Sequence, residues 1–266
     1  MLPLHHAPIL LSNGIIAPKG DRVKHKNKKV LTADDLKSKI ENMRIRLVIV
    51  NTEDCLKLLA EPERFCSAGR LEKCRRTVDA RARAQGYAAE LALSYCLSGP
   101  ALLPPEYRYE KSGKPVIDGG HISLAHSGKY GVCAYSDAPV GADIEVNRVV
   151  SPALARRILC AEERDEYRAA PDNEYLLRKF VIKEAYFKLT GEGIGGRFSD
   201  VREDGGRLSR RGKAAGYAKV FTLDYAIGCI VTEEEFEDSD AETAILTDGS
   251  IESALPVQGV PHEQRA

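Results

Sequence analysis

Gly141-Ala142-Asp143-Ile144-Glu145 and, further along, Phe180-Val181-Ile182-Lys183-Glu184-Ala185-Tyr186-Phe187-Lys188 are the stretches that decide the fold. The first is predicted to be a strand, on which side chains two apart share a face, so Asp143 and Glu145 emerge together while Ile144 points into the core. The second has a helical pattern, in which Glu184 and Lys188, four apart, also share a face.

Together the two stretches hold three carboxylates and a lysine that local geometry directs to one point. An all-oxygen set of ligands suits Mg²⁺, and the lysine is left to meet a phosphate. This arrangement is typical of phosphoryl transfer. A simpler interpretation has the strand acids on a solvated face and Glu184 and Lys188 in a helix ion pair worth about 0.3 kcal/mol.

The two stretches resemble the signatures of the 4'-phosphopantetheinyl transferase superfamily, G-x-D-I-E and [FW]-x-x-K-E-[AS]-x-x-K-x-x-G, the second complete through Gly191. The likeness is to the larger, surfactin-type class and runs from about Arg44 to Val231. It implies an α+β fold of two similar α/β halves, related by a pseudo-twofold axis and built on antiparallel sheets, with coenzyme A in the cleft between them.

The resemblance also divides the chain. We expect residues 44–140 to form an N-terminal half that binds the coenzyme A phosphates, and residues 141–232 to form a C-terminal half with the metal site. Residues 1–43 are basic, and family members begin with a strand like the one that opens at Met43, so we expect a disordered leader there and Met43 as the true start. A basic arm that contacts RNA is the alternative. Residues 233–266 are acidic and then contain Ser, Gly and Pro, which predicts a disordered tail.

Periodicity and capping residues predict the elements of the two halves. The expected helices cover about Thr52–Ala60, Val78–Leu97, Ser151–Leu159, Glu162–Arg168 and Asp172–Gly191, and the expected strands cover Met43–Val50, Tyr107–Ile117, His121–Ala125, Gly131–Tyr135, Gly141–Val146, Arg197–Arg202, Gly216–Leu223 and Tyr225–Val231.

Bulk composition excludes several classes of protein. Lys and Arg number 39, as do Asp and Glu, so the chain lacks the basic excess of a general nucleic-acid binder. No stretch approaches the run of about 18 apolar residues that suggests a membrane span. The seven cysteines are odd in number and form no C-x-x-C pair, which favours reduced thiols and a cytoplasmic location.

Coenzyme A carries a diphosphate and a 3'-phosphate, and the resemblance assigns basic residues of the N-terminal half to them. Arg70 and Lys73 fall in the basic cluster before Cys74-Arg75-Arg76, Lys114 in the G-K-P match, and His126 in the match to S-H-S-G. Ala125 replaces the first serine of that last motif, which removes one hydroxyl worth about 1 kcal/mol of binding. The family's helix arginine maps to Arg83, two residues out of register.

In the C-terminal half, the resemblance assigns Asp143, Glu145 and Glu184 to Mg²⁺. Glu184 is also the candidate base for the attacking serine, directly or through a metal-bound water. Lys188 would bind and neutralise the diphosphate as its bond breaks. Lys183 is a motif position to which no role is assigned.

The activity that the resemblance implies is transfer of the 4'-phosphopantetheine group of coenzyme A to a serine of an apo acyl or peptidyl carrier protein, with release of adenosine 3',5'-bisphosphate. Because such carriers are acidic helical domains, we expect a docking surface with exposed apolar and basic residues, with Arg156 and Arg157 as candidates. A monomer without nucleic-acid or membrane partners is expected. The alternatives are a metal-dependent phosphoester hydrolase and a non-catalytic binder of coenzyme A or carrier protein. Neither the carrier nor its pathway follows from the sequence.

Overall fold

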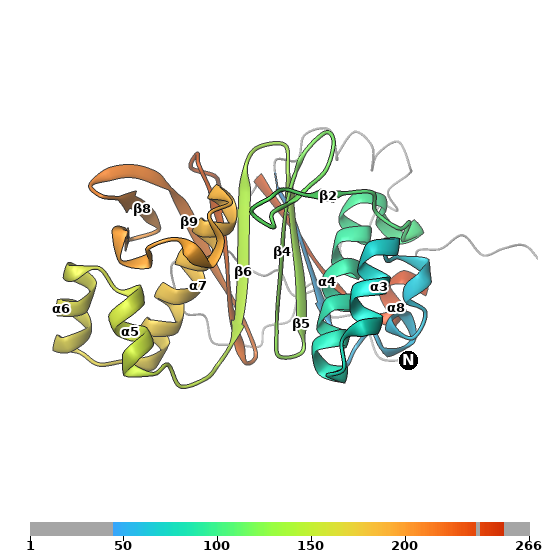
Figure 1. The fold of residues 1–266 in the computed structure, drawn as a ribbon, viewed down its shortest axis with the longest axis horizontal. Coiled ribbons are helices and arrows are strands. Elements are labelled where there is room, and N and C mark those ends of the chain that lie inside the picture. The colour runs from blue at the N-terminus through green and yellow to red at the C-terminus, as the bar shows by residue number, and fades with distance from the viewer. Residues whose placement is uncertain (1–44, 238–239, 253–266) are drawn as a thin grey trace, which may run out of the picture.

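The computed structural model describes residues 45–237 and 240–252, which form two lobes, each a sheet covered by helices (Figure 1). The first sheet has the strand order β11-β1-β5-β4. Its members are β1 (Ile45–Asn51), β4 (His121–Ser127), β5 (Tyr130–Ser136) and β11 (Ala241–Leu246). Pairing within it is antiparallel except between β1 and β11, which run parallel.

The second sheet is antiparallel throughout and has the order β6-β10-β9-β8-β7. Its members are β6 (Val140–Val146), β7 (Val201–Asp204), β8 (Arg207–Arg210), β9 (Lys213–Leu223) and β10 (Ala226–Thr232). A small hairpin of β2 (Arg108–Tyr109) and β3 (Pro115–Val116) replaces the single strand expected over Tyr107–Ile117.

The helices cover the outer faces of the two sheets. They are α2 (Leu56–Leu59), α3 (Ala68–Arg76), α4 (Ala80–Ser98) and α8 (Asp248–Glu252) in the first lobe, and α5 (Pro152–Ile158), α6 (Ala161–Ala169) and α7 (Asn173–Thr190) in the second. Short 3₁₀ turns stand at Pro62–Arg64, Gly99–Ala101, Gly193–Gly195 and Phe198–Asp200.

The two lobes repeat one arrangement. In chain order, β1, α4, β4 and β5 of the first lobe correspond to β6, α7, β9 and β10 of the second, and the strand orders β1-β5-β4 and β6-β10-β9 match. The expected fold class, an α+β chain of two similar halves, is confirmed.

Three hydrophobic clusters fix the order of the layers. One lies between α4 and the first sheet, and one between α7 and the second sheet. The third joins the sheets to each other, with Leu47 and Ile49 of β1 on one side and Ala142 and Ile144 of β6 on the other. Because Ile144 points into this central cluster, its neighbours Asp143 and Glu145 lie on the opposite face of β6, which α7 covers.

Helix α7 approaches β6 closely because the strand carries glycine at the contact. A Cβ built on Gly141 would lie 2.0 Å from the carbonyl oxygen of Ala185. The helix begins after Asp172, whose carboxylate accepts from the backbone of Glu174 and Tyr175. It ends at Gly191, which has a left-handed φ of 77°. These contacts fix the register of the helix against the strand.

The end of the chain corrects one expectation. A disordered tail was expected from residue 233, but Phe236 is buried in the central cluster and β11 pairs with β1 at the edge of the first sheet. Asp248 accepts from the backbone of Lys57 and Leu58, and the Cys55 thiol donates to the Leu246 carbonyl oxygen. The strand returns to the first lobe because it satisfies the open edge of β1.

The structure also bears on the expectations for other parts of the chain. Strand β8 was not anticipated, and α2 is shorter than expected. The leader over residues 1–43 and the part of the tail after residue 252 lie outside the described residues. In the part of the chain that the structure describes, no helix combines the length and apolarity needed to cross a membrane.

Candidate functional site

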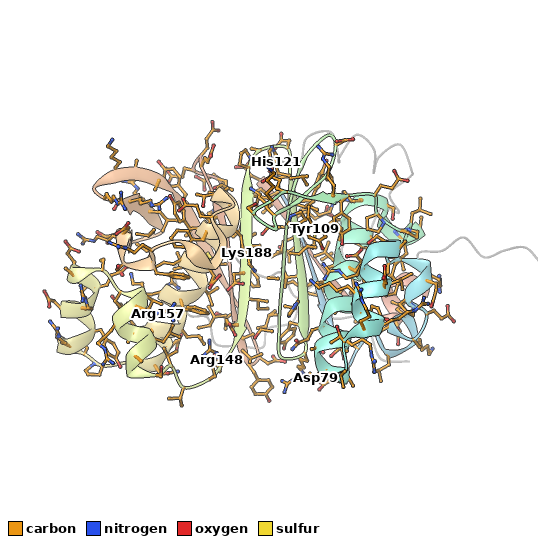
Figure 2. All side chains as sticks on the ribbon, in the orientation of Figure 1. Asp79, Tyr109, His121, Arg148, Arg157 and Lys188 are labelled. Carbon is orange, nitrogen blue, oxygen red and sulfur yellow. The ribbon has the colours of Figure 1, made fainter. Side chains whose placement is uncertain are left out.

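Asp143 and Glu145 lie on the same face of β6, as their spacing predicted, and α7 covers that face. Asp143 is 7% exposed, while Glu145, nearer the end of the strand, is half-buried. Glu184 and Lys188 extend from α7, and both are half-buried. Lys188 lies at the middle of the molecule, between the lobes (Figure 2).

Lys188 does not form the helix ion pair with Glu184 that was the simpler interpretation. Its Nζ donates to Oδ1 of Asp143 at 2.7 Å and to the carbonyl oxygen of Leu124 on β4 at 3.2 Å. The lysine therefore joins the strand acid of the second lobe to the edge strand of the first. Its charge lies where the two lobes meet.

The acids affect one another's protonation. Burial raises the pKa of Asp143, the Lys188 ammonium opposes that rise, and Glu145 adds to it. Burial also raises the pKa of Glu184 to about 7, and Asp143 and Glu145 contribute in the same direction. The three carboxylates therefore contribute to one negative region.

This region has the right donors for a divalent cation but not the assembled geometry. Among the described residues, no three His, Cys, Asp or Glu side chains are close enough together to hold a metal ion. Two observations still fit a cation: the ligand atoms are all carboxylate oxygens, and the pKa values of Asp143 and Glu184 are raised because their buried charge is not fully compensated.

Three of the expected phosphate-binding cations act electrostatically on His126 of β4. Desolvation lowers the pKa of this imidazole, although its side chain is exposed, and the charges of Lys188, Arg70 and Lys73 lower it further. Three cations acting on one imidazole form a positive region beside the acids of β6 and α7. Such a region suits a polyphosphate.

Arg70 is held by a buried acid that the sequence analysis missed. Glu90 of α4 is fully buried and accepts from Ser67 N and Oγ at 3.1 and 2.6 Å, from Arg70 Nε at 3.2 Å and from the Tyr107 hydroxyl at 3.0 Å. The signal was present as a lone acid within the apolar run of α4. Glu90 fixes the start of α3, the helix that carries Arg70 and Lys73.

Lys114 reaches across the lobes from the β2–β3 hairpin. Its Nζ donates to the carbonyl oxygen of Leu189 near the end of α7 at 2.6 Å, and burial lowers its pKa. A pocket of about 160 Å³ lies here, lined by Lys114, Leu124 and Ile122 of the first lobe and by Phe187 and Lys188 of the second.

Arg83 is not joined to this cluster by any contact described in the structure. Its Nη1 donates to the Thr77 carbonyl oxygen at 3.3 Å, at the turn between α3 and α4. The role assigned to Arg83 stays a prediction.

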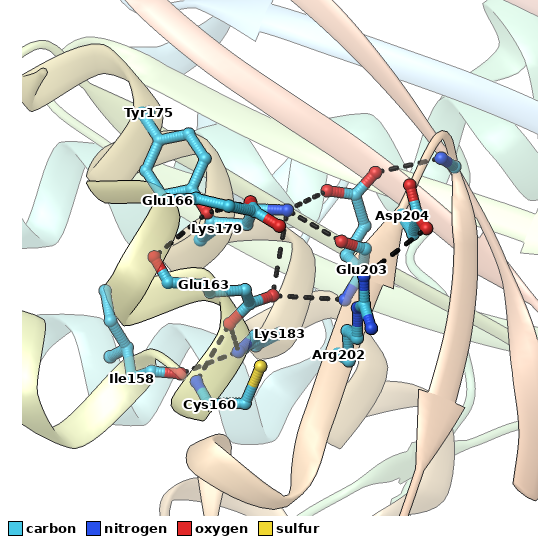
Figure 3. Close-up of polar contacts among 11 residues, drawn as sticks. Ile158, Cys160, Glu163, Glu166, Tyr175, Lys179, Lys183, Arg202, Glu203 and Asp204 are labelled. Carbon is cyan, nitrogen blue, oxygen red and sulfur yellow. Dashed lines mark hydrogen bonds and ion pairs between the residues drawn. The ribbon is translucent and has the colours of Figure 1, made fainter. Parts of the chain in front are cut away.

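Lys183, the motif position without an assigned role, is completely buried (Figure 3). Its Nζ donates to the carbonyl oxygen of Ile158 at 2.7 Å and forms an ion pair with the fully buried Glu163 of α6. Glu163 also accepts from the backbone N–H groups of Cys160 and Glu203 at 3.0 and 3.1 Å. Lys183 therefore fastens the junction of α5 and α6 to α7, one residue before Glu184.

Glu184 faces a second, larger pocket. About 690 Å³ is enclosed by α5, α7 and the segment around Phe198, and the lining includes Phe180, Arg156 and Arg157. Arg156 and Arg157 are exposed on α5, and Arg157 lies on the second lobe in Figure 2. The structure thus places the expected docking arginines beside the candidate base.

Comparisons with known proteins find relatives of one kind. Residues 139–236 match the sequence model of the 4'-phosphopantetheinyl transferase superfamily, a segment that contains both motifs. The 4'-phosphopantetheinyl transferase psf-1 of Bacillus pumilus is 35% identical over 152 residues, which are 54% of this chain and 63% of that protein. The 4'-phosphopantetheinyl transferase Sfp of Bacillus subtilis strain 168 is 27% identical over 139 residues, which are 49% of this chain and 62% of that protein.

A cyanobacterial protein extends the set of relatives. The 4'-phosphopantetheinyl transferase HetI of Nostoc sp. strain PCC 7120 is 33% identical over 101 residues, which are 34% of this chain and 43% of that protein. The chain therefore spans less than two thirds of the length of these relatives. The resemblance drawn from the two motifs, to the surfactin-type class of the superfamily, is confirmed.

Proposed function

We propose that this chain, which is similar to the 4'-phosphopantetheinyl transferases, moves the 4'-phosphopantetheine group of coenzyme A onto a serine hydroxyl of an apo acyl or peptidyl carrier protein. The serine oxygen forms a bond to the phosphorus that carries pantetheine, and the bond from that phosphorus to the diphosphate bridging oxygen breaks. Adenosine 3',5'-bisphosphate leaves, and the serine proton passes to a base. The observation that carries the proposal is the Lys188–Asp143 ion pair of the second lobe, whose lysine also contacts Leu124 of the first lobe, with Glu184 on the same helix.

Asp143, Glu145 and Glu184 are the residues that would hold Mg²⁺. When bound, the ion supplies positive charge and Lewis acidity to the diphosphate oxygens. The carboxylate donor set and the raised pKa values of Asp143 and Glu184 support this assignment.

Lys188 is proposed to bind the diphosphate and to neutralise charge as the leaving group departs. Its ammonium is held between the lobes by Asp143 and Leu124, so it does not have to be ordered when the substrate arrives. Arg70, Lys73, Lys114 and His126 would bind the phosphates of the coenzyme from the first lobe. The electrostatic effect of Arg70 and Lys73 on His126 and the position of Lys114 at the pocket between the lobes support this role.

Glu184 is the proposed general base. Its carboxylate lines the pocket beside Arg156 and Arg157, where the serine of a docked carrier would come within reach and could give up its proton. The proton passes to Glu184 directly or through a water molecule.

The carrier protein is proposed to dock at α5. Arg156 and Arg157 project from this helix into the lining of the pocket at Glu184, where an acidic helical partner would bring its serine to the base. We propose in addition that the protein is a cytoplasmic monomer with no nucleic-acid or membrane partner. Its seven free, buried thiols support a reducing compartment.

The experiment uses the full chain with coenzyme A, Mg²⁺ and a panel of apo carrier proteins from fatty-acid, polyketide and nonribosomal-peptide synthesis. Intact-protein mass should show the gain of one phosphopantetheine group on at least one carrier. Glu184→Gln should abolish this gain while leaving the circular dichroism spectrum unchanged. Release of phosphate or nucleotide without carrier modification would instead identify a phosphoester hydrolase, and coenzyme A binding without either reaction would identify a non-catalytic binder.

A further inference from the structure

Two serine side chains of β4 contact the backbone of β6 along the seam, the line where the edges of the two sheets meet. Strands β4 and β6 are the edge strands of their sheets and form no backbone ladder with each other. Instead, the backbone N–H of Ala142 donates to Ser123 Oγ at 2.8 Å, and that of Val146 donates to Ser127 Oγ at 3.1 Å. Two backbone donors of β6 that would otherwise face the seam unpaired are satisfied in this way.

The two serines occupy equivalent positions on β4. They are four residues apart on a strand, so their side chains share one face, with the small Ala125 between them. The small side chains of Ser123, Ala125 and Ser127 let the edge of β6 approach this part of the face. Ser123 and Ser127 therefore perform the same structural task at the two ends of the seam.

Only one of the two serines contacts the candidate cation site. Ser127 Oγ donates to Oε2 of Glu145 at 2.8 Å, whereas the other contact of Ser123 Oγ is the Ala142 carbonyl oxygen at 3.4 Å. A serine hydroxyl has a single proton, and Ser127 directs it to Glu145 because the Val146 N–H already occupies an acceptor position.

Glu145 needs this support more than Asp143 does. Asp143 is buried and fixed by Lys188, while Glu145 is half-buried at the end of its strand. Besides Ser127, the described contact of its carboxylate is with Arg148, whose exposed Nη2 lies 3.6 Å from Oε1. An exposed pair at that distance restricts a side chain weakly.

We propose that Ser127 is a positioning residue that orients the Glu145 carboxylate for a divalent cation from across the seam between the lobes. The inference rests on the proposed function, since it assigns Glu145 to that cation. One hydroxyl thereby links the alignment of the two sheets to the geometry of a cation ligand. Sequence spacing alone gives no sign of this, because Ser127 and Glu145 come from different sheets.

The test measures binding of Mn²⁺ to the full chain by electron paramagnetic resonance, with and without coenzyme A and without any carrier protein. Ser127→Ala should weaken Mn²⁺ binding about 10- to 100-fold, as loss of a partner of a ligand does. Ser123→Ala is the matched control, because it removes the equivalent seam contact but no contact to an acid. It should leave Mn²⁺ affinity unchanged while lowering the thermal midpoint as much as Ser127→Ala does. Ser127→Thr, which keeps the hydroxyl, should restore binding.

Three results would overturn the inference: wild-type affinity in Ser127→Ala, equal loss in Ser123→Ala, or no Mn²⁺ binding by the wild-type chain. The proposed reaction can fail independently of it. If no carrier is modified but the two serine variants differ in Mn²⁺ affinity, the reaction is refuted and Ser127 keeps its role. If carriers are modified and the variants bind alike, the reaction stands and the role of Ser127 is refuted.

Discussion

Lys188 Nζ lies 2.7 Å from Oδ1 of Asp143, so the cation of α7 pairs with an acid of β6 and not with Glu184 one helical turn before it. The pair joins the two signature motifs in space. It also holds a positive charge at the junction of the lobes, where Leu124 of the first lobe provides its second acceptor.

Replacement of Lys188 tests this charge directly. Lys188→Met should lower the rate of carrier modification about 10²- to 10³-fold, because the diphosphate loses a positioned cation. The rate is measured by intact-protein mass over time at saturating coenzyme A. Lys213→Met, at an exposed lysine that begins β9, is the control and should leave the rate unchanged. A Lys188→Met protein as fast as the wild type would contradict the role of this lysine.

His126 should report on phosphate binding. Desolvation and the charges of Lys188, Arg70 and Lys73 lower its pKa, and a bound phosphate would offset these cations and favour the protonated ring. Adenosine 3',5'-bisphosphate should therefore raise the pKa of His126, measured by NMR titration of the imidazole, with His126→Gln to assign the signal. An unchanged pKa would place the phosphates elsewhere.

The lowered pKa of His126 also predicts how the free energy of unfolding depends on pH. The pKa of His126 is lower in the folded chain than in the unfolded chain, so between these two values the unfolded chain binds more protons. The contribution of His126 to the free energy of unfolding should therefore fall as pH is lowered through that window. The pH profile of His126→Gln should lack this contribution, so the difference between the wild-type and variant profiles of unfolding free energy should report it.

The buried pair of Lys183 and Glu163 should dominate the stability of the second lobe. Glu163→Gln leaves Lys183 in the interior without its counter-charge and weakens the environment of Lys179, so the free energy of unfolding should drop by about 3–5 kcal/mol. Urea denaturation measures it. Asp165→Asn on the same helix is the control, since the Asp165–Arg168 pair is 74% and 73% exposed and should contribute below about 1 kcal/mol. Equal effects of the two changes would refute the assignment.

Gly141 should tolerate no side chain. In Gly141→Ala, the new Cβ would meet the backbone of α7 at Ala185 and Leu189, so α7 must move away from β6 at a cost of about 1–3 kcal/mol or more. Gly69→Ala on α3 is the matched comparison, because a Cβ there has open space and should stabilise by about 0.4–1 kcal/mol. Thermal unfolding of both variants measures the contrast. A neutral Gly141→Ala would mean that the close approach of α7 is not required.

Strand β11 should stabilise the hydrophobic cluster between α4 and the first sheet. Leu246 on β11 is 1% exposed, so Leu246→Ala should cost about 2–5 kcal/mol of unfolding free energy. Ile245 beside it is 42% exposed, and Ile245→Ala should cost less than about 1 kcal/mol. The measurement is chemical denaturation followed by circular dichroism. If both changes were neutral, β11 would not be part of the folded unit.

Local pattern predicted much of the site. The spacing of Asp143 and Glu145 placed both acids on one face of β6, and Ile144 points into the core as expected. Asp172 and Gly191 marked the ends of α7 because capping depends on the residues at the ends themselves. Tyr130-Gly131-Val132-Cys133 and Tyr225-Ala226-Ile227-Gly228-Cys229 are similar in sequence, and they fall at β5 and β10, which hold equivalent places in the two sheets.

Local sequence patterns could not predict contacts between residues that are far apart in the sequence. Nothing near Lys183 indicated that its ammonium is buried against Glu163, and nothing in the acidic segment after Glu233 indicated that β11 pairs with β1. Glu90 and Ser127 were missed for the same reason, since each acts on a residue of another element.

The sequence by itself determined which side chains share a face, where the helices and strands of the two motifs begin and end, and the resemblance to a known superfamily. These follow from the fixed periods of strand and helix, which act over a few residues. Only the tertiary structure decided which opposite charges meet, because the packing of α7 on β6 through Gly141 and the seam from β4 to β6 set those distances. Each charged side chain could pair with more than one opposite charge, and the packing of the layers selects the pairing with the lowest free energy.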